Sequence, residues 1–175
     1  ISPEKKLYIT EIPEKYMAGE SLKIAFELPD AASPKSMENI EDPRVIAIAV
    51  SSIALFEPYK TGERILFGNG GNGELYQLTG WSHHEDGFTW TEGKKAELLL
   101  PVDNTSDMTA RVSVSPFLRE DKIKSQKVNI YINGKKSGQW ILKSPETSLQ
   151  EFKIQKNLIK DKSVKITFEL PDAKS

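Results

Sequence analysis

The sequence contains no cysteine among its 175 residues. The chain can therefore form neither a disulfide nor a thiolate metal site, and it has no cysteine nucleophile. Eukaryotic secreted domains often carry disulfides, whereas a bacterial periplasmic or surface domain with a large core can fold without them. We therefore expect a bacterial protein.

The chain also lacks an excess of either charge, because it has 24 Lys and Arg and 25 Asp and Glu, which gives a net charge of -1. Proteins that grip a phosphate backbone need a basic excess, so nucleic acid is not an expected partner. No stretch approaches the roughly 18 apolar residues of a membrane span, and residues 1–15 lack the layout of a signal peptide. Any export or anchoring signal is expected to lie outside this sequence.

The sequence motifs of the common enzyme mechanisms are missing as well. There is no G-x-S-x-G elbow, no P-loop, no G-x-G-x-x-G after a strand and no H-E-x-x-H. The loop Gly68–Gly73 is rich in glycine, but no Lys-Ser/Thr pair follows it, so a flexible turn is expected there. We expect no catalytic residue, bound metal or cofactor in this chain.

What the sequence does contain is alternation of apolar and polar residues, which is typical of strands with one face in a core. The pattern is clearest at residues 22–28, 128–132 and 164–170, while the run 45–56 is more continuously apolar. That run indicates a central strand or pair of strands, with a buried helix as the alternative. Further strands are expected at residues 63–67, 75–80, 88–91, 95–101, 109–117, 138–142 and 149–155.

Turn residues separate these segments. Asn133-Gly134, within YINGKKS, is the strongest hairpin signal, because a type I′ turn needs two residues that tolerate positive φ. Many short strands with no amphipathic helix of ordinary length predict an all-β fold, an antiparallel β-sandwich that is jelly-roll-like.

A long internal repeat indicates how the chain is organised. Residues 21–33 (SLKIAFELPDAAS) and 163–175 (SVKITFELPDAKS) are identical at 10 of 13 positions, at an offset of 142 residues. This spacing suits a whole domain rather than a solenoid repeat. We interpret the repeat as a sign of tandem domains, the alternative being two equivalent strands of one pseudo-symmetric sandwich.

The tandem interpretation divides the chain into two parts. Residues 1–57 would hold the closing strands of one copy, and residues 60–175 the opening and middle strands of the next. Either part alone would expose strand edges and half a core, so both are expected to pack into the same sandwich. The run 45–56 would then be buried against Val112, Val114, Val128 and Ile130.

Residues that could contact a ligand concentrate between Gly80 and Thr91, where both histidines and two of the three tryptophans lie. Trp81, His83, His84 and Glu85 are the candidate ligand-binding residues, with Trp140, beside Tyr131 and the predicted hairpin, as a second aromatic platform. Aromatic faces stack on sugar rings, while His and Glu hold hydroxyl groups. The alternative for each tryptophan is packing in the core, and we favour it for Trp90.

Two kinds of chemistry are weaker alternatives for the same segment. His83, His84, Glu85 and Asp86 supply metal-ligand types, but four adjacent residues rarely converge on one ion. Glu85 and Asp86 are acids, but neighbours on an extended segment point to opposite faces and cannot flank a glycosidic bond. Elsewhere, Asp42 and Arg44 are expected to form a local ion pair before the run 45–56.

Several of these motifs together resemble a known family. The order G-W-S-x-x-E-x-x-x-x-W-T at 80–91, V-N-I-Y-I-N-G at 128–134, F-E-L-P-D-A-x-S-P at 26–34 and D-P-R at 42–44 is similar to accessory β-sandwich domains. Such domains are attached to bacterial phosphoglycerol transferase I-like enzymes and to some membrane-bound glycosyltransferases. The similarity spans most of the chain in permuted order, with 59–175 as the opening and middle and 21–56 as the close.

The resemblance implies an extracytoplasmic location, periplasmic or at the cell surface, and a supporting role in glycan assembly or modification. It transfers no catalytic residue. The expected function is therefore a non-catalytic accessory module that binds an oligosaccharide or glycan, beside a catalytic or membrane domain of the parent protein. The alternatives are a purely structural spacer and, less favoured, a glycan-active enzyme domain.

Overall fold

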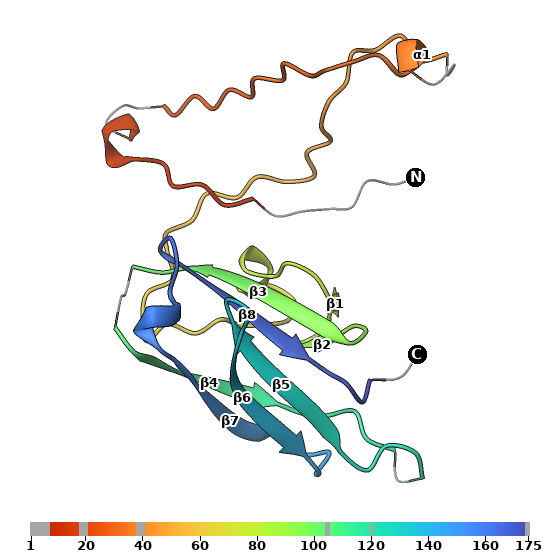
Figure 1. Ribbon diagram of the computed structural model, residues 1–175, viewed down its shortest axis with the longest axis vertical. Helices are drawn as coiled ribbons and strands as arrows, with labels where there is room; N and C mark the ends of the chain where they lie inside the picture. Colours follow the sequence, from red (N-terminus) through yellow and green to blue (C-terminus); the bar gives the residue numbers. More distant parts are fainter. Residues whose placement is uncertain (1–7, 18–20, 38–40, 104–105, 120, 174–175) are drawn as a thin grey trace. The chain divides into compact units, whose positions relative to one another are not determined.

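The structure is a computed structural model, and it describes residues 8–17, 21–37, 41–103, 106–119 and 121–173 (Figure 1). The chain divides into two compact units. The smaller comprises Tyr8–Leu55, and the larger contains the described residues from Phe56 onward. In the described part of the chain, no helix is long and apolar enough to cross a membrane.

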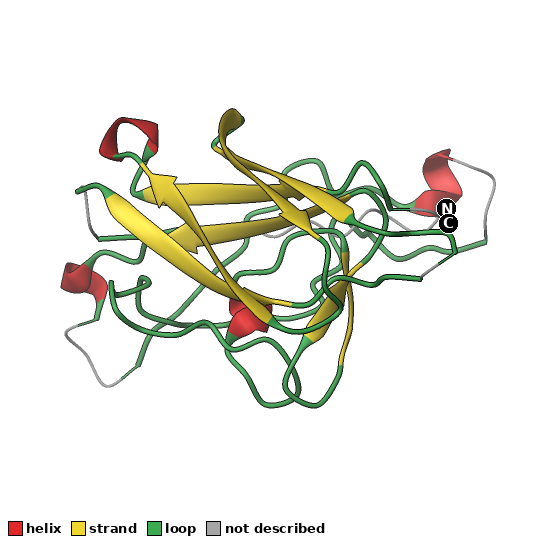
Figure 2. Ribbon diagram, turned by 90° about the horizontal axis from the view of Figure 1, so that it is seen from below, coloured by secondary structure: helices red, strands yellow, loops and turns green. Residues whose placement is uncertain are grey.

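The larger unit is an all-β, antiparallel sandwich, as the sequence predicts. Its strands form a four-stranded sheet of order β3-β8-β5-β6 and two-stranded sheets β4-β7 and β1-β2, and they stand out as arrows among loops in Figure 2. The bounds are β1 (Trp81–His84), β2 (Thr89–Thr91), β3 (Lys95–Pro101), β4 (Met108–Val114), β5 (Gln126–Ile132), β6 (Lys135–Leu142), β7 (Ser148–Ile154) and β8 (Ser163–Glu169). Its jelly-roll connectivity stays a prediction.

Alternation along the strands builds the core of this unit. On β8, Val164, Ile166 and Phe168 are buried. Because residues directly opposite each other in a ladder share a face, their partners on β3 and β5, such as Leu98 opposite Ile166 and Ile130 opposite Phe168, are buried on the same side. The four-stranded sheet therefore presents one continuous apolar face.

The β4-β7 pair covers part of that face. Phe152 and Ile154 of β7 belong to the same buried cluster as the four-stranded sheet, and alternate residues of β4, from Met108 to Val114, pack against it. Phe56 and Tyr59, which precede the first strand, also contact this core.

The hairpin between β5 and β6 confirms the predicted turn. Asn133 and Gly134 form the two-residue loop between the strands, and both have positive φ, 46° and 83°. The Asn133 side chain also donates to the carbonyl of Leu158 at 2.7 Å and accepts from the Lys165 amide at 2.9 Å. Its role thus extends beyond the turn to the neighbouring β8.

Two predicted strands, at 63–67 and 75–80, are wrong, and β1 was not predicted. The segment before β1 contains the 3-10 turn η2 (Gly73–Leu75) and a single bridge from Gln77 to Leu98. Asn72 accepts from the Leu66 amide and donates to the Arg64 carbonyl. A side chain that bonds local backbone in this way competes with ladder formation.

The Gly68–Gly73 loop is a bonded turn rather than a phosphate cradle. Gly71 and Gly73 donate to the carbonyls of Gly68 and Leu66, and the Asn69 amide donates to the Glu85 carbonyl in the following hairpin. A Cβ on Gly68 would lie 2.6 Å from the Phe88 nitrogen. The loop therefore packs tightly against residues 85–88.

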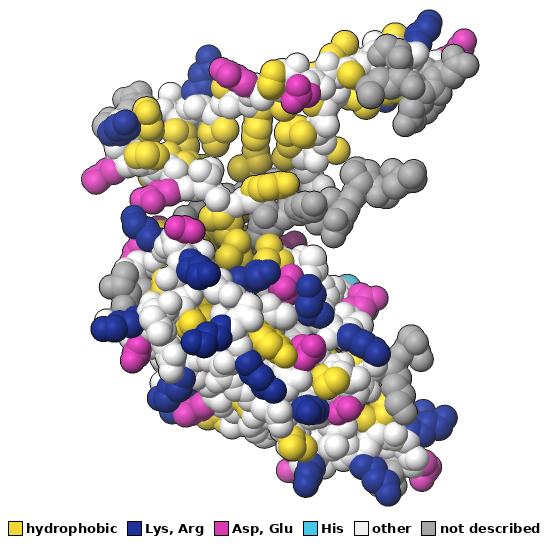
Figure 3. All heavy atoms as spheres, viewed as in Figure 1, with side chains coloured by type: hydrophobic (Ala, Val, Ile, Leu, Met, Phe, Trp, Pro, Cys, Tyr) yellow, Lys and Arg dark blue, Asp and Glu magenta, His cyan; other side chains and the backbone are white. Residues whose placement is uncertain are grey.

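The smaller unit is different, because its predicted strands do not form ladders. It contains the 3-10 turn η1 (Glu14–Tyr16), the one-turn helix α1 (Pro34–Met37) and a bridge between Ala32 and Ile46. No strand is formed in the described residues of 21–29 or in 45–56. Most of their large apolar side chains are exposed instead, including those of Ile24, Phe26, Val45, Ile48 and Leu55, and hydrophobic side chains are prominent on the surface of this unit in Figure 3.

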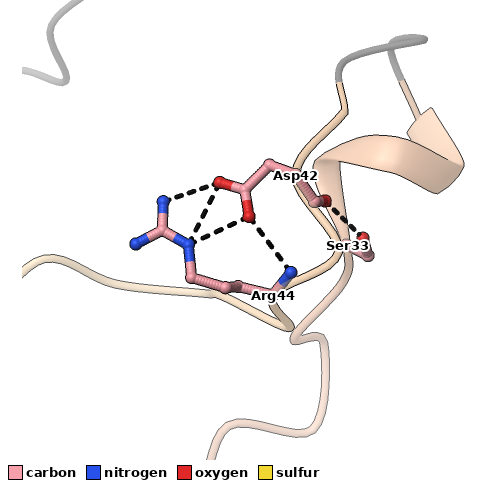
Figure 4. A network of polar contacts seen from close by, with 3 residues as sticks. All are labelled: Ser33, Asp42 and Arg44. Carbon is pink, nitrogen blue, oxygen red and sulfur yellow. Dashed lines mark hydrogen bonds and ion pairs between the residues drawn. The ribbon is translucent and has the colours of Figure 1, made fainter.

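The predicted pair of Asp42 and Arg44 is confirmed in this unit (Figure 4). The Arg44 guanidinium contacts the carboxylate at 2.6 Å, and the Arg44 amide donates to it as well. The side-chain hydrogen bond and then the backbone hydrogen bond from Arg44 lower the pKa of Asp42 from 3.8 to about 2. The Asp42 carbonyl accepts from Ser33, which ties the two arms of the α1 turn together.

The boundary between the units lies between Leu55 and Phe56, close to the boundary at 57–60 that the sequence predicts. The shared core of residues 1–57 and 60–175 stays a prediction. Val128 and Ile130 are buried within the larger unit, whose core cluster consists of residues from Phe56 onward.

Candidate functional site

The β1-β2 hairpin carries most of the candidate residues. Trp81 lies opposite Thr91 and His84 opposite Thr89, with an irregularity between them. The turn is closed by the Glu85 amide, which donates to the Phe88 carbonyl. Gly87, at φ 84°, allows the backbone to reverse there.

Trp81 is a packing residue on the inner side of this hairpin. Its ring stacks on Phe67 at a centroid distance of 5.1 Å and meets Phe168 edge-on at 6.4 Å. Its indole nitrogen donates to the Glu97 carbonyl at 2.8 Å. These contacts on two sides of the ring and at its nitrogen anchor Trp81 to the core. Of the two sequence interpretations for Trp81, core packing therefore holds for most of its surface.

A shallow polar cleft of about 390 Å³ nevertheless runs along this part of the hairpin. It brings together three predicted site residues, Trp81, His83 and His84, with Glu74 and Gln77. His84 Nε2 lies 2.9 Å from Gln77 Oε1, and Gln77 Nε2 is enclosed without a hydrogen-bond partner among the described residues. The cleft thus offers imidazole and amide groups for hydroxyl recognition.

Glu85 and Asp86 lie at the tip of the hairpin, outside the residues that line this cleft. Asp86 accepts from the Asn69 side chain at 2.9 Å, which holds the tip against the Gly68–Gly73 loop. Within the described part of the chain, no three His, Asp or Glu side chains are grouped so that they could hold a metal ion.

Trp140 is buried and does not offer an open aromatic platform, so the packing alternative holds for it. The residue is 7% exposed, packs against Phe152 and Phe168, and donates its indole hydrogen to the Glu151 carbonyl. It pairs with Val128 across the β5-β6 ladder. Since both strands alternate, Trp140 shares the inner face with Val128 and is a core residue.

Trp90 is the tryptophan with the exposed ring, in contrast to the sequence interpretation. It is 37% exposed and lies between Phe88 and Phe117, which are 45% and 55% exposed. The ring centroids are 5.6 Å and 6.4 Å from Trp90, both in edge-to-face geometry. We call these three residues the exposed aromatic cluster.

The pairing register explains the exchange of roles between the two tryptophans. Trp81 is opposite Thr91, so those two side chains share the inner face, and Trp90 must point to the other face. This direction can be read from the sequence only when the hairpin register is known, and the acidic tip at 85–87 gives no clear register. Phe117 is distant from Trp90 in the sequence, and no local pattern joins the two.

A second polar area lies on the outer face of the four-stranded sheet. Glu169 accepts from Asn129 at 2.8 Å and from Tyr131 at 3.1 Å, and Lys136 donates to Asn129. The Asn129 and then the Tyr131 hydrogen bonds lower the pKa of Glu169, while the bond to Glu169 raises the pKa of Tyr131. These groups satisfy one another, so Tyr131 forms a surface network rather than a platform with Trp140.

Beside it lies Glu97, whose side chain is only 12% exposed. Burial raises its pKa, but Lys165, then Lys95, and hydrogen bonds including that from Thr167 outweigh this effect, and the net pKa is lowered. The outer face is therefore an ion-pair and hydrogen-bond network that ties β3, β8 and β5 together.

We compared the chain with known protein families, curated proteins and solved structures. No protein-family model matches the chain, no curated protein matches it, and no solved structure matches it.

Proposed function

We propose that this chain is a non-catalytic accessory module that contacts carbohydrate in an extracytoplasmic bacterial protein concerned with surface or periplasmic glycans. The observation that carries the proposal is the exposed aromatic cluster, because exposed apolar patches on a folded domain mark interaction sites. Trp90 offers a ring face for the C–H groups of a pyranose, with Phe88 and Phe117 at its sides.

Polar groups near this cluster complete the chemistry that a saccharide requires. Asp86 and Asn69 hold each other at the hairpin tip, close to Phe88 in the chain. Their carboxylate and amide can exchange that bond for hydroxyl groups. The separate cleft lined by His83 and His84 of β1, and by Gln77 in the segment before it, offers further donors and acceptors.

Calorimetric titration with a panel of bacterial oligosaccharides tests the proposal. The unaltered chain should bind at least one of them, and Trp90→Ala should abolish the heat of binding. Leu149→Ala on β7 is the matched control, since Leu149 is an exposed apolar residue outside the cluster, and it should bind as the unaltered chain does. Circular dichroism checks that each variant is folded.

Failure to bind any member of the panel at millimolar concentration would overturn carbohydrate recognition. The module would then be a spacer that holds a catalytic or membrane domain of the parent protein at a fixed distance. The internal repeat of residues 21–33 and 163–175 is the observation that favours this second function.

A further inference from the structure

Two nearly identical segments occur in opposite environments in this molecule. In the larger unit, residues 163–169 form β8, the strand between β3 and β5. In the smaller unit, the repeat of that sequence at residues 21–27 forms no ladder. Phe168 is 8% exposed, whereas its counterpart Phe26 is 55% exposed, and Ile166 and Ile24 are 5% and 47% exposed.

The difference shows what the smaller unit lacks. A strand that is apolar on one face is stable only when that face is buried and its backbone is paired. Residues 21–27 have the composition of a sheet strand but no sheet, so the smaller unit carries the closing part of a sandwich of this type. Residues 45–55, which follow the repeat, are the rest of that part.

The segment 45–55 has the properties of an unpaired strand. Six of its large apolar side chains, those of Val45, Ile46, Ile48, Val50, Ile53 and Leu55, are between 49% and 69% exposed. Its one ladder contact among the described residues is the bridge from Ile46 to Ala32. Its apolar side chains and most of its backbone are therefore open to pairing.

The larger unit offers an edge where such a strand fits. Two strands, β4 and β7, face a sheet of four, and at about 4.8 Å per strand a pair is narrower than the face it covers. β4 pairs with β7 on one side and with no strand on the other among the described residues. Its inward residues Ala110, Val112 and Val114 are half-buried against the core.

We propose that the open edge of β4 is a strand-docking site and that its occupant is the segment Val45–Leu55 of a second copy of this chain. The occupant adds backbone hydrogen bonds to β4 and buries alternate apolar side chains against the core, as in other cases of strand addition. The repeat supplies the specificity, because the segment that follows residues 21–33 is the one that completes a sandwich containing residues 163–175.

Extension of the full chain tests this site. A second copy of residues 34–57 is added after Ser175. The added segment then follows residues 163–175 directly, just as the original segment follows residues 21–33. The matched control carries Ile46→Ser, Ile48→Ser and Val50→Ser in the added copy. Melting temperature, sedimentation and amide exchange at β4 are measured for both proteins and for the unextended chain.

The extended chain should melt about 5–10 °C above its control, because its added strand buries apolar side chains that the control lacks. The amides of β4 should exchange more slowly, and concentration-dependent association of the unextended chain should disappear. The control should associate as the unextended chain does. The proposal would be overturned if the extended chain and its control had the same melting temperature, the same amide exchange at β4 and the same degree of association.

Discussion

At the scale of single residues, the three tryptophans show how one residue type serves two purposes. Trp81 and Trp140 bond backbone carbonyls through their indole nitrogens and pack on Phe168. Trp90 contacts Phe88 and Phe117 in an exposed cluster. Buried tryptophans with a bonded N–H stabilise a fold, whereas an exposed one is available to a ligand.

Truncation of the two kinds of tryptophan should therefore have unequal effects on stability. Trp140→Ala should lower the free energy of unfolding by about 3–5 kcal/mol, because it leaves a cavity between Phe152 and Phe168. Trp90→Ala should cost about 1 kcal/mol or less. Urea denaturation measures both, and a Trp90→Ala loss as large as that of Trp140→Ala would contradict the assignment of the exposed ring.

The acid stability of the sandwich should depend on Glu97. Its pKa is lower in the folded chain than the ordinary value of 4.5, so the folded state favours the ionised carboxyl. That contribution is present above pH 4.5 and is lost as the pH falls through the folded pKa. We expect stability to decline below that pH.

Glu97→Gln isolates this carboxyl. The variant should be less stable than the unaltered chain at neutral pH, and the difference should shrink as the pH falls below about 4.5 or as salt is added. Glu92→Gln is the control on the same unit. Thermal denaturation across about pH 3–7 measures the effect, and a constant difference across that range would show that charge is not its cause.

At the scale of elements, the approach of the β1-β2 hairpin to β3 depends on one glycine. Gly80 has φ 77°, and a Cβ there would lie 1.8 Å from the Lys95 carbonyl oxygen. The Glu92 amide donates to the Gly80 carbonyl, and the Glu97 amide donates to the Thr79 carbonyl. The hairpin is thus positioned by backbone contacts that leave no room for a side chain at residue 80.

Gly80→Ala should cost about 3 kcal/mol or more, since the strained φ and the clash with β3 act together. Gly93→Ala is the matched control, because Gly93 has φ 73° but no atom within 4 Å of its Cβ position, and it should cost about 1–2 kcal/mol. Chemical denaturation compares the two. Equal losses would mean that φ alone, and not the close approach, matters at Gly80.

At the scale of the whole molecule, the chain joins a β-sandwich to a segment that has the composition of a sheet strand but forms no strand among the described residues. The larger unit has its own core, while the smaller unit exposes alternate apolar side chains. Open edges and exposed apolar strands favour association and aggregation. Stability and oligomeric state of this protein should therefore depend on what covers the two surfaces.

Deletion of residues 1–57 removes the segment Val45–Leu55 and also Phe56, which meets Tyr76 edge-on at 5.9 Å. We expect the remainder to unfold or aggregate, as the shared core predicted from the sequence requires. Deletion of residues 1–55 keeps Phe56 and separates its effect from that of the segment. A soluble monomer with the melting transition of the full chain after both deletions would contradict the prediction.

The sequence by itself determined which segments of the larger unit become most of its strands and where the β5-β6 turn lies. Alternation and the Asn133-Gly134 pair are local signals, and local sterics suffice to interpret them. The repeat could also be found without a structure, because it is an identity between the sequences of residues 21–33 and 163–175.

Tertiary structure alone decided which of these segments are paired and which tryptophan faces out. Alternation tells that a strand has an apolar face but not whether a sheet is present to cover it, and residues 21–27 and 163–169 share one pattern with opposite burial. The outward direction of Trp90 follows from the register opposite Trp81, and its contact with Phe117 joins segments that only the folded chain brings together.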